Sequence, residues 1–156
     1  MAFSGLDLAN AIKARKNPLP LPPWVEHMRV HEENLVHTVE PGRIGSTWMP
    51  GKQFSLPDGY VQGGLLTALA DGGQWLTIAT TLDALEAWVT LDLHIRFVRP
   101  IKAGEQVEIE SRVLNRSKTS AILETTFTRA DGKLAAKVTG GWSKSETRNV
   151  VALQPE

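Results

Sequence analysis

The chain has 156 residues, of which 42% are hydrophobic and 22% are charged. This length suits one domain with a core of its own, and the composition excludes a disordered or fibrous chain. Seventeen basic residues balance seventeen acidic ones, so we expect no generally basic surface for nucleic acid, and the absence of cysteine excludes disulfides, thiolate metal sites and cysteine nucleophiles.

We expect three parts: an N-terminal helix with a proline-rich connector, a main domain and a polar tail, over residues 1–33, 34–143 and 144–156. Apolar residues at helical spacing over residues 6–14, with Ser4 as N-cap, predict a short amphipathic helix. Four prolines over residues 18–23 favour a stiff extended connector. We expect no signal peptide and no membrane span, since a span needs roughly 20 apolar residues. The sequence is thus interpreted as that of a cytoplasmic protein.

The main domain has the pattern of an α+β fold. Strands are predicted over residues 35–40 and 43–49, joined by a turn at Pro41-Gly42, and an apolar helix is predicted over residues 61–70. Four longer strands are predicted after it, over residues 87–98, 106–114, 121–129 and 133–142. A helix that is apolar on nearly every side should be wrapped by the antiparallel sheet rather than lie at its margin.

The first of the long strands alternates apolar and polar residues. The alternation predicts one face made of Val89, Leu91, Leu93, Ile95 and Phe97, and an opposite face made of Thr90, Asp92, His94 and Arg96. On this basis Thr90 points outward with Asp92 and His94, on a face that is solvated or part of an interface.

The segment around the apolar helix carries the residues suited to chemistry. Gly63 and Gly64 leave bare backbone N–H groups at a helix start, where the helix dipole also favours a developing oxyanion. Asp71 lies in an apolar run, where a carboxylate is costly unless it is paired or used. Local propensity leaves two interpretations open: residues 71–73 form a turn followed by a strand over 74–80, or the helix continues.

Several motifs together resemble the hot-dog thioesterases of the phenylacetate-degradation type, which are related to the 4-hydroxybenzoyl-CoA thioesterases. The family's helix motif runs Asn-x-x-Gly-x-x-His-Gly-Gly, followed by an apolar helix with an acidic residue nine positions after the histidine. The matching positions are Gly59, Gly63, Gly64 and Asp71. Residues 89–100 with Gly104 resemble the family's first long strand, and residues 130–136 resemble its last hairpin. The resemblance implies a hot-dog fold with one long central helix over residues 61 to about 80.

The resemblance also implies an activity, the hydrolysis of an acyl thioester, most readily acyl-CoA. It implies that the Gly63 N–H stabilises the oxyanion and that Asp71 acts as general base or nucleophile. Eight residues of helix separate the two by about 12 Å, so one scissile carbonyl cannot touch both. A two-fold axis would bring Gly63 of one chain near Asp71 of another, which predicts a homodimer or a dimer of dimers.

Two positions depart from the family motif. Gln62 replaces the histidine and Leu56 replaces the asparagine. Glutamine can still donate a hydrogen bond, whereas leucine cannot. We therefore keep two alternatives to the thioesterase: a non-catalytic acyl-CoA-binding protein, and a hydratase or dehydratase, which would need a histidine beside the acidic residue.

The remaining candidates concern substrate binding. Thr90 lies where some family members carry a serine that orients water, so Gln62 and Thr90 join Gly63 and Asp71 as catalytic candidates. The candidate substrate-binding residues are Gly64, Tyr60, Trp75, Arg99, Lys102 and Lys118, the cations for the phosphates of coenzyme A and the aromatics for the acyl group. Core packing or solvated charge is the plainer alternative for each. The histidines have no metal-ligand spacing, and no cofactor is implied beyond the coenzyme A of the substrate.

Overall fold

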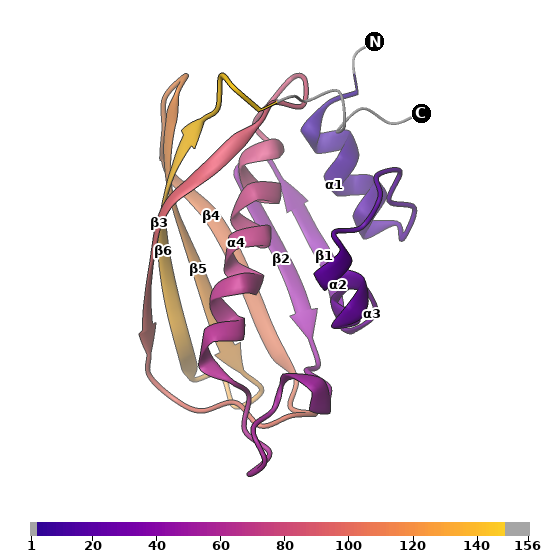
Figure 1. Cartoon of the computed structure of the whole chain (residues 1–156), viewed down its shortest axis with the longest axis vertical. Helices are drawn as coiled ribbons and strands as arrows, with labels where there is room; N and C mark the ends of the chain where they lie inside the picture. Colours follow the sequence, from indigo (N-terminus) through magenta and orange to yellow (C-terminus); the bar gives the residue numbers. More distant parts are fainter. Residues whose placement is uncertain (1–2, 149–156) are drawn as a thin grey trace.

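A curved antiparallel sheet packs around one side of a long helix in this computed structural model, which describes residues 3–148 (Figure 1). The six strands are β1 (Asn34–Glu40), β2 (Arg43–Trp48), β3 (Trp88–Phe97), β4 (Val107–Arg116), β5 (Ser120–Arg129) and β6 (Leu134–Lys144), in the order β1-β2-β4-β5-β6-β3. The helices are α1 (Gly5–Lys13), α2 (Pro23–His27), α3 (Val30–Glu33), the 3-10 turn η1 (Lys52–Phe54) and α4 (Gly63–Ala79). The predicted α+β hot-dog architecture is confirmed.

The central helix, α4, is unbroken through the segment where propensity alone left a turn open. It continues from Gly63 to Ala79, and the threonine side chains at its C-terminal end bond back to its own carbonyls, Thr80 Oγ1 to Thr77 O at 2.6 Å. Each glycine inside a helix costs roughly 1 kcal/mol. Burial of the helix against the sheet offsets this cost, since Leu66, Leu69, Ile78 and their neighbours on α4 are buried.

The N-terminal helix covers the C-terminal end of α4. Ser4 and Asp7 form the predicted capping box at the start of α1. Gly5 lies directly against the backbone of α4: a Cβ at this position would come 1.8 Å from the Ala79 carbonyl oxygen. Leu8 and Ala9 are buried in a cluster with the end of α4 and with β2. The contact therefore requires glycine at position 5.

The alternation predicted for β3 is wrong at its start, because the strand contains a bulge. Thr90 pairs with Trp142 and Asp92 pairs with Gly141, so Leu91 is an extra residue without a partner on β6. Thr90 and Leu93 consequently face α4 together, and Leu91 is 66% exposed. The apolar and polar alternation of the sequence cannot reveal this, since a bulge changes the face of every residue before it relative to those after it.

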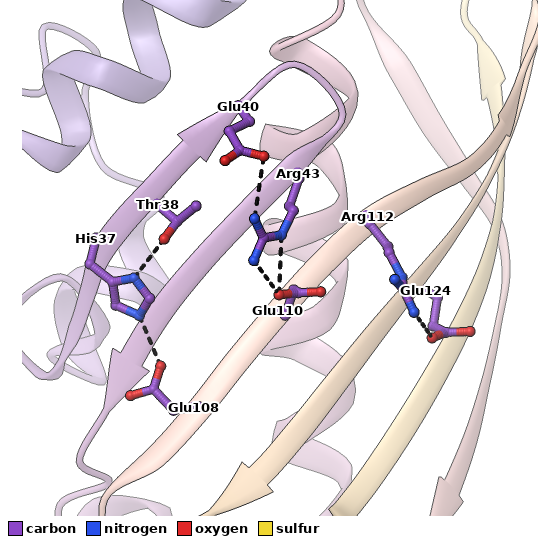
Figure 2. Close-up of polar contacts among 8 residues, drawn as sticks. All are labelled: His37, Thr38, Glu40, Arg43, Glu108, Glu110, Arg112 and Glu124. Atoms are coloured by element: carbon purple, nitrogen blue, oxygen red, sulfur yellow. Dashed lines mark hydrogen bonds and ion pairs between the residues drawn. The ribbon is translucent and has the colours of Figure 1, made fainter.

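The face of the sheet that points away from α4 carries pairs of opposite charges between neighbouring strands. Figure 2 shows His37 beside Glu108, with Nε2 and Oε2 2.8 Å apart, and Arg43 beside Glu110 at 2.9 Å. Glu124 accepts from Lys137 at 2.9 Å and lies within 3.4 Å of Arg112. This face is polar, so the main apolar core lies on the side of α4.

The Glu124–Lys137 pair predicts a pH-dependent contribution to stability. The hydrogen bond from Lys137 is the main cause that lowers the pKa of the Glu124 carboxyl. A lowered pKa in the folded state stabilises the fold above the ordinary glutamate pKa, and this stabilisation is lost as the pH falls through the folded-state pKa. Glu124→Gln should therefore lower the free energy of unfolding by at most about 1 kcal/mol at pH 7, and by less as the pH falls, in urea titrations at several pH values. Glu26→Gln, at an exposed position on α2, is the control; a loss that does not change with pH would contradict the prediction.

Candidate functional site

The carboxylate of Asp71 lies in the middle of α4 and contacts the edge strand. Its side chain is half-buried, and Thr90 Oγ1 on β3 donates a hydrogen bond to Asp71 Oδ1 at 2.5 Å. Thr90 therefore points toward the helix and not outward with Asp92 and His94, because the bulge at Leu91 turns it inward. Among residues 3–148 no second hydrogen-bond donor to this carboxylate is found, so Oδ2 is available to a ligand or to water.

The start of α4 presents unpaired backbone donors. Within the described part of the chain, the N–H groups of Gly63 and Gly64 donate to no protein acceptor. Gln62 is the N-cap, and its exposed side chain makes no hydrogen bond to the helix. The Gln62 backbone N–H is bound to Phe54 O at 2.8 Å, which holds the helix start in place. Free N–H groups at a helix N-terminus suit a negatively charged or carbonyl oxygen.

A groove of about 280 Å³ opens beside this helix start. Its walls are the first turn of α4 and the chain that leaves β3, and most of its lining is apolar: Val61, Gly63, Leu66, Phe97, Val98 and Ile101 among others. A Cβ at Gly63 would come 2.9 Å from the Phe97 ring. The missing side chain at Gly63 therefore leaves room between the helix and Phe97.

Three of the predicted substrate-binding residues lie at this end of the molecule. Arg99 lines the groove, and its Nη1 donates to Leu134 O at 2.8 Å. Tyr60 and Lys102 face each other across a β-bridge, with Lys102 Nζ 5.7 Å from the centre of the Tyr60 ring. Two cations and an aromatic ring thus lie at the end of the molecule where α4 begins.

The other predicted substrate-binding residues are placed differently. Lys118 lies in the turn between β4 and β5, at the opposite end of the sheet from the start of α4 (Figure 1). Gly64 is exposed, and a Cβ added there would meet no atom within 4 Å. Trp75 is half-buried and packs against both the α1 cluster and the cluster around Trp88. One chain alone therefore does not bring all six residues to one place.

Gln74 is a residue that the sequence analysis left without a role. Its side chain is fully buried on α4, and Trp142 Nε1 donates to Gln74 Oε1 at 2.9 Å. The sequence does contain a signal for a buried role: Gln74 is a polar residue within an apolar helix, directly after two glycines. Its partners are distant in the sequence, so the sequence alone did not identify them.

Two further observations concern metal binding and membrane spans. Between residues 3 and 148 there is no group of three or more histidine, aspartate or glutamate side chains arranged to hold a metal ion. No helix in the described chain is both long and apolar enough to cross a membrane.

Comparison with known proteins identifies relatives over most of the domain. A family model described as the thioesterase superfamily matches residues 58–136. A candidate esterase of Saccharolobus solfataricus is 35% identical over 91 residues, which are 58% of this chain and 64% of that protein, so the chain covers less than two thirds of this relative. Human acyl-coenzyme A thioesterase 13 is 29% identical over 98 residues, or 62% of this chain and 69% of that protein.

Solved structures agree with the fold. The Escherichia coli PaaI protein, from the phenylacetic acid degradation operon, has a TM-score of 0.73 at 17% identity, covering 90% of this chain and 93% of that one. The smu.793 protein of Streptococcus mutans, solved with bound acetyl-CoA, has a TM-score of 0.67 at 22% identity, covering 74% of this chain and 91% of that one. These comparisons confirm the predicted family resemblance.

The contact between Thr90 and Asp71 predicts a measurable effect on stability. Thr90→Val removes the hydroxyl while conserving the shape of the side chain, and leaves a half-buried carboxylate with one donor fewer. We expect the free energy of unfolding to fall by about 1–2 kcal/mol in urea denaturation at pH 7. Thr90→Ser, which retains the hydroxyl, should lose clearly less. Equal losses in both variants would mean that packing of the threonine methyl, and not the hydrogen bond, is responsible.

Proposed function

Because the chain belongs to the thioesterase superfamily, we propose that it hydrolyses an acyl-CoA thioester to a free acid and the thiol of coenzyme A. The observation that carries the proposal is the half-buried Asp71 carboxylate, to which Thr90 of β3 donates a hydrogen bond. Asp71 lies on the same unbroken helix that begins with the free N–H of Gly63. The name of the human relative, an acyl-coenzyme A thioesterase, and the acetyl-CoA bound to the streptococcal protein support acyl-CoA as the substrate class.

In the proposed reaction, water or Asp71 itself attacks the thioester carbonyl. As a general base, Asp71 takes a proton from the water through Oδ2, while Thr90 holds Oδ1. The Gly63 N–H donates to the oxygen of the carbonyl as it becomes negative, and the helix dipole adds to this stabilisation. The carbon–sulfur bond then breaks, and the thiolate leaves and takes up a proton. As a nucleophile, Asp71 would instead form an acyl-enzyme anhydride that water hydrolyses.

We propose that each site is shared by two subunits. Gly63 and Asp71 of one chain are about 12 Å apart along α4, too far to contact one carbonyl. An antiparallel copy of α4 across a two-fold axis would bring Gly63 of one subunit to Asp71 of the partner subunit. β3 is at the edge of the sheet and carries exposed apolar residues, Leu91 and Phe97, which favour contact with a second copy. Arg99 and Lys102 would then meet the phosphates of coenzyme A, and Lys118 would reach the same site only from the partner.

The departures from the family motif support one alternative. The Leu56 side chain is exposed in the turn before α4 and has no group that could hold water or a carbonyl. The side-chain amide of Gln62 has no protein partner in the described chain. An acyl-CoA-binding protein without turnover would have the same groove and the same N–H donors. Measured turnover, and not binding, distinguishes the two functions.

The first test is a thiol-release assay over aromatic, short-chain and long-chain acyl-CoAs. We expect hydrolysis of at least one substrate class, and we expect Asp71→Asn to lower kcat by about 100-fold or more, because the base or nucleophile is lost. Asp83→Asn, at an exposed position after α4, is the matched control and should retain the wild-type rate. Saturable binding without thiol release by the wild type would establish the non-catalytic alternative.

A second test removes the proposed oxyanion donor. Gly63 is the first residue of α4 and follows Gln62 in an extended conformation, so the backbone at this position accepts proline. Proline removes the N–H, and its ring also adds a Cβ beside Phe97. We expect Gly63→Pro to lower kcat by about 100- to 1,000-fold, whereas Gly63→Ala, which adds a comparable Cβ and keeps the N–H, should lose far less. Equal losses would assign the effect to the contact of that Cβ with Phe97.

Mixed dimers test whether the site is shared. A dimer of Gly63→Pro and Asp71→Asn chains contains one site with both wild-type groups only if the two groups come from different subunits. Co-refolding the two inactive variants should therefore restore activity, up to about a quarter of the wild-type level for random pairing. Activity no higher than that of the separate variants would exclude a shared site.

A further inference from the structure

The rotation of α4 about its own axis is weakly defined by hydrophobic packing alone. The helix is apolar on nearly every side, so several orientations would bury similar apolar area. Gly72 and Gly73, next to Asp71, have no side chains that could interlock with the sheet. A directional interaction on the buried side of the helix would therefore add to the selection of the orientation in which Asp71 contacts Thr90.

A buried polar network joins α4 to the sheet one turn beyond Asp71. Gln74 is 0% exposed; it accepts from Trp142 Nε1 at 2.9 Å and donates through Nε2 to Thr125 Oγ1 at 3.1 Å. The same Nε2 lies 3.4 Å from Val138 O. The hydroxyls of Thr125 and Ser111 share a further hydrogen bond of 2.7 Å. The network thus connects α4 with β4, β5 and β6.

Two glycines provide the space for this network. A Cβ at Gly140 on β6 would come 1.9 Å from Gln74 Oε1, so any larger residue would displace the amide. A Cβ at Gly73 on α4 would come 3.2 Å from Ser111 Oγ. A buried polar network of this kind costs stability unless each member is satisfied, and when satisfied it favours one arrangement over its neighbours.

The network and the Asp71–Thr90 contact are neighbours in space. Trp142, which bonds Gln74, is the register partner of Thr90, which bonds Asp71. Asp71 and Gln74 are about 60° apart around the helix and about 4.5 Å apart along it. At a side-chain radius of about 5–6 Å, a rotation of about 20° would move the carboxylate by about 2 Å. That movement is enough to break its bond to Thr90.

We propose that Gln74 is a positioning residue, whose bonds to Thr125 and Trp142 set the rotation of α4 that brings Asp71 to Thr90. Gln74 touches no reacting atom and acts only through Asp71. The effect on catalysis rests on the catalytic role of Asp71 proposed above. The dependence of the Asp71–Thr90 bond on Gln74 is a geometric statement and does not rest on that role.

Gln74→Met tests the proposal, because methionine keeps the length of the side chain and makes none of the bonds. We expect kcat for acyl-CoA hydrolysis to fall about 10- to 100-fold with KM within about threefold of wild type, since the substrate site remains while the carboxylate is misplaced. Thr77→Val is the matched control: Thr77 is equally buried on α4, but its hydroxyl bonds only to Gly73 O of the same helix, at 2.7 Å. Its kcat should stay close to the wild-type value.

A double-mutant cycle separates positioning from general destabilisation. In a Thr90→Val background, Gln74→Met should lower kcat little further, because both changes act through the same carboxylate. If Gln74→Met does not fold, Thr125→Val is the second variant, because it removes the acceptor of the Gln74 amide on β5. The same change in kcat is expected. Unchanged kcat in a folded Gln74→Met protein, an equal loss in Thr77→Val, or fully multiplicative losses in the double variant would overturn the proposal.

A crystal structure of Gln74→Met gives a readout that does not depend on activity. We expect the Asp71 Oδ1 to Thr90 Oγ1 hydrogen bond to be broken, and an intact bond would overturn the proposal. If the wild-type protein hydrolyses no acyl-CoA, the proposed function fails, and this crystallographic comparison alone decides the role of Gln74.

Discussion

The enclosure of α4 by the curved sheet is the constraint on which the rest of the structure depends. A helix with two adjacent glycines and an internal aspartate would be marginal in water. Contact with β2, β4, β5, β6 and β3 keeps it helical over its whole length, and α1 covers its C-terminal end. The same enclosure buries one side of the helix and leaves Asp71 half-buried at the edge strand. The position of the carboxylate is therefore a consequence of how the core is built.

Polar groups near α4 divide into two kinds with opposite consequences. The Gln74 network is fully buried and satisfied, so it contributes a defined orientation and has no contact with solvent. The N–H groups of Gly63 and Gly64 and one oxygen of Asp71 are left without protein partners in the described chain. Of these groups, the Gly63 N–H lies beside the apolar groove, and the free Asp71 oxygen lies about 12 Å further along α4. Under the proposed function, a ligand bonds both kinds of group only when two subunits meet. In the role proposed for Gln74, this buried network orients the Asp71 carboxylate, which keeps one oxygen without a protein partner.

The sequence predicted the fold class, the order of α1, α4 and the six strands, and the position of most turns, because periodicity and turn residues are local signals. It did not predict the short helices α2 and α3, which lie where only a connector was expected. It did not by itself decide that α4 continues, since Asp71-Gly72-Gly73 is locally typical of a turn; the family resemblance supplied that prediction. The face of Thr90 was predicted wrongly because Leu91 fits a regular alternation although it is a bulge. Gln74 was missed because its partners, Thr125 and Trp142, are 51 and 68 residues away in the chain. Such contacts depend on strand register, which local patterns do not determine.

The bulge in β3 also affects how this chain should be aligned with its relatives. Thr90 and Leu93 face the same side although they are three residues apart, so their spacing is that of an irregular strand. Consider a relative without the bulge, aligned without gaps to residues 93–97 of this chain. Such an alignment would match Leu91 with the residue of the relative that faces the helical carboxylate. The residue equivalent to Thr90 in such a relative is the one that pairs with the counterpart of Trp142 on the neighbouring strand. Homology at this position is thus defined by cross-strand pairing and not by counting along the chain.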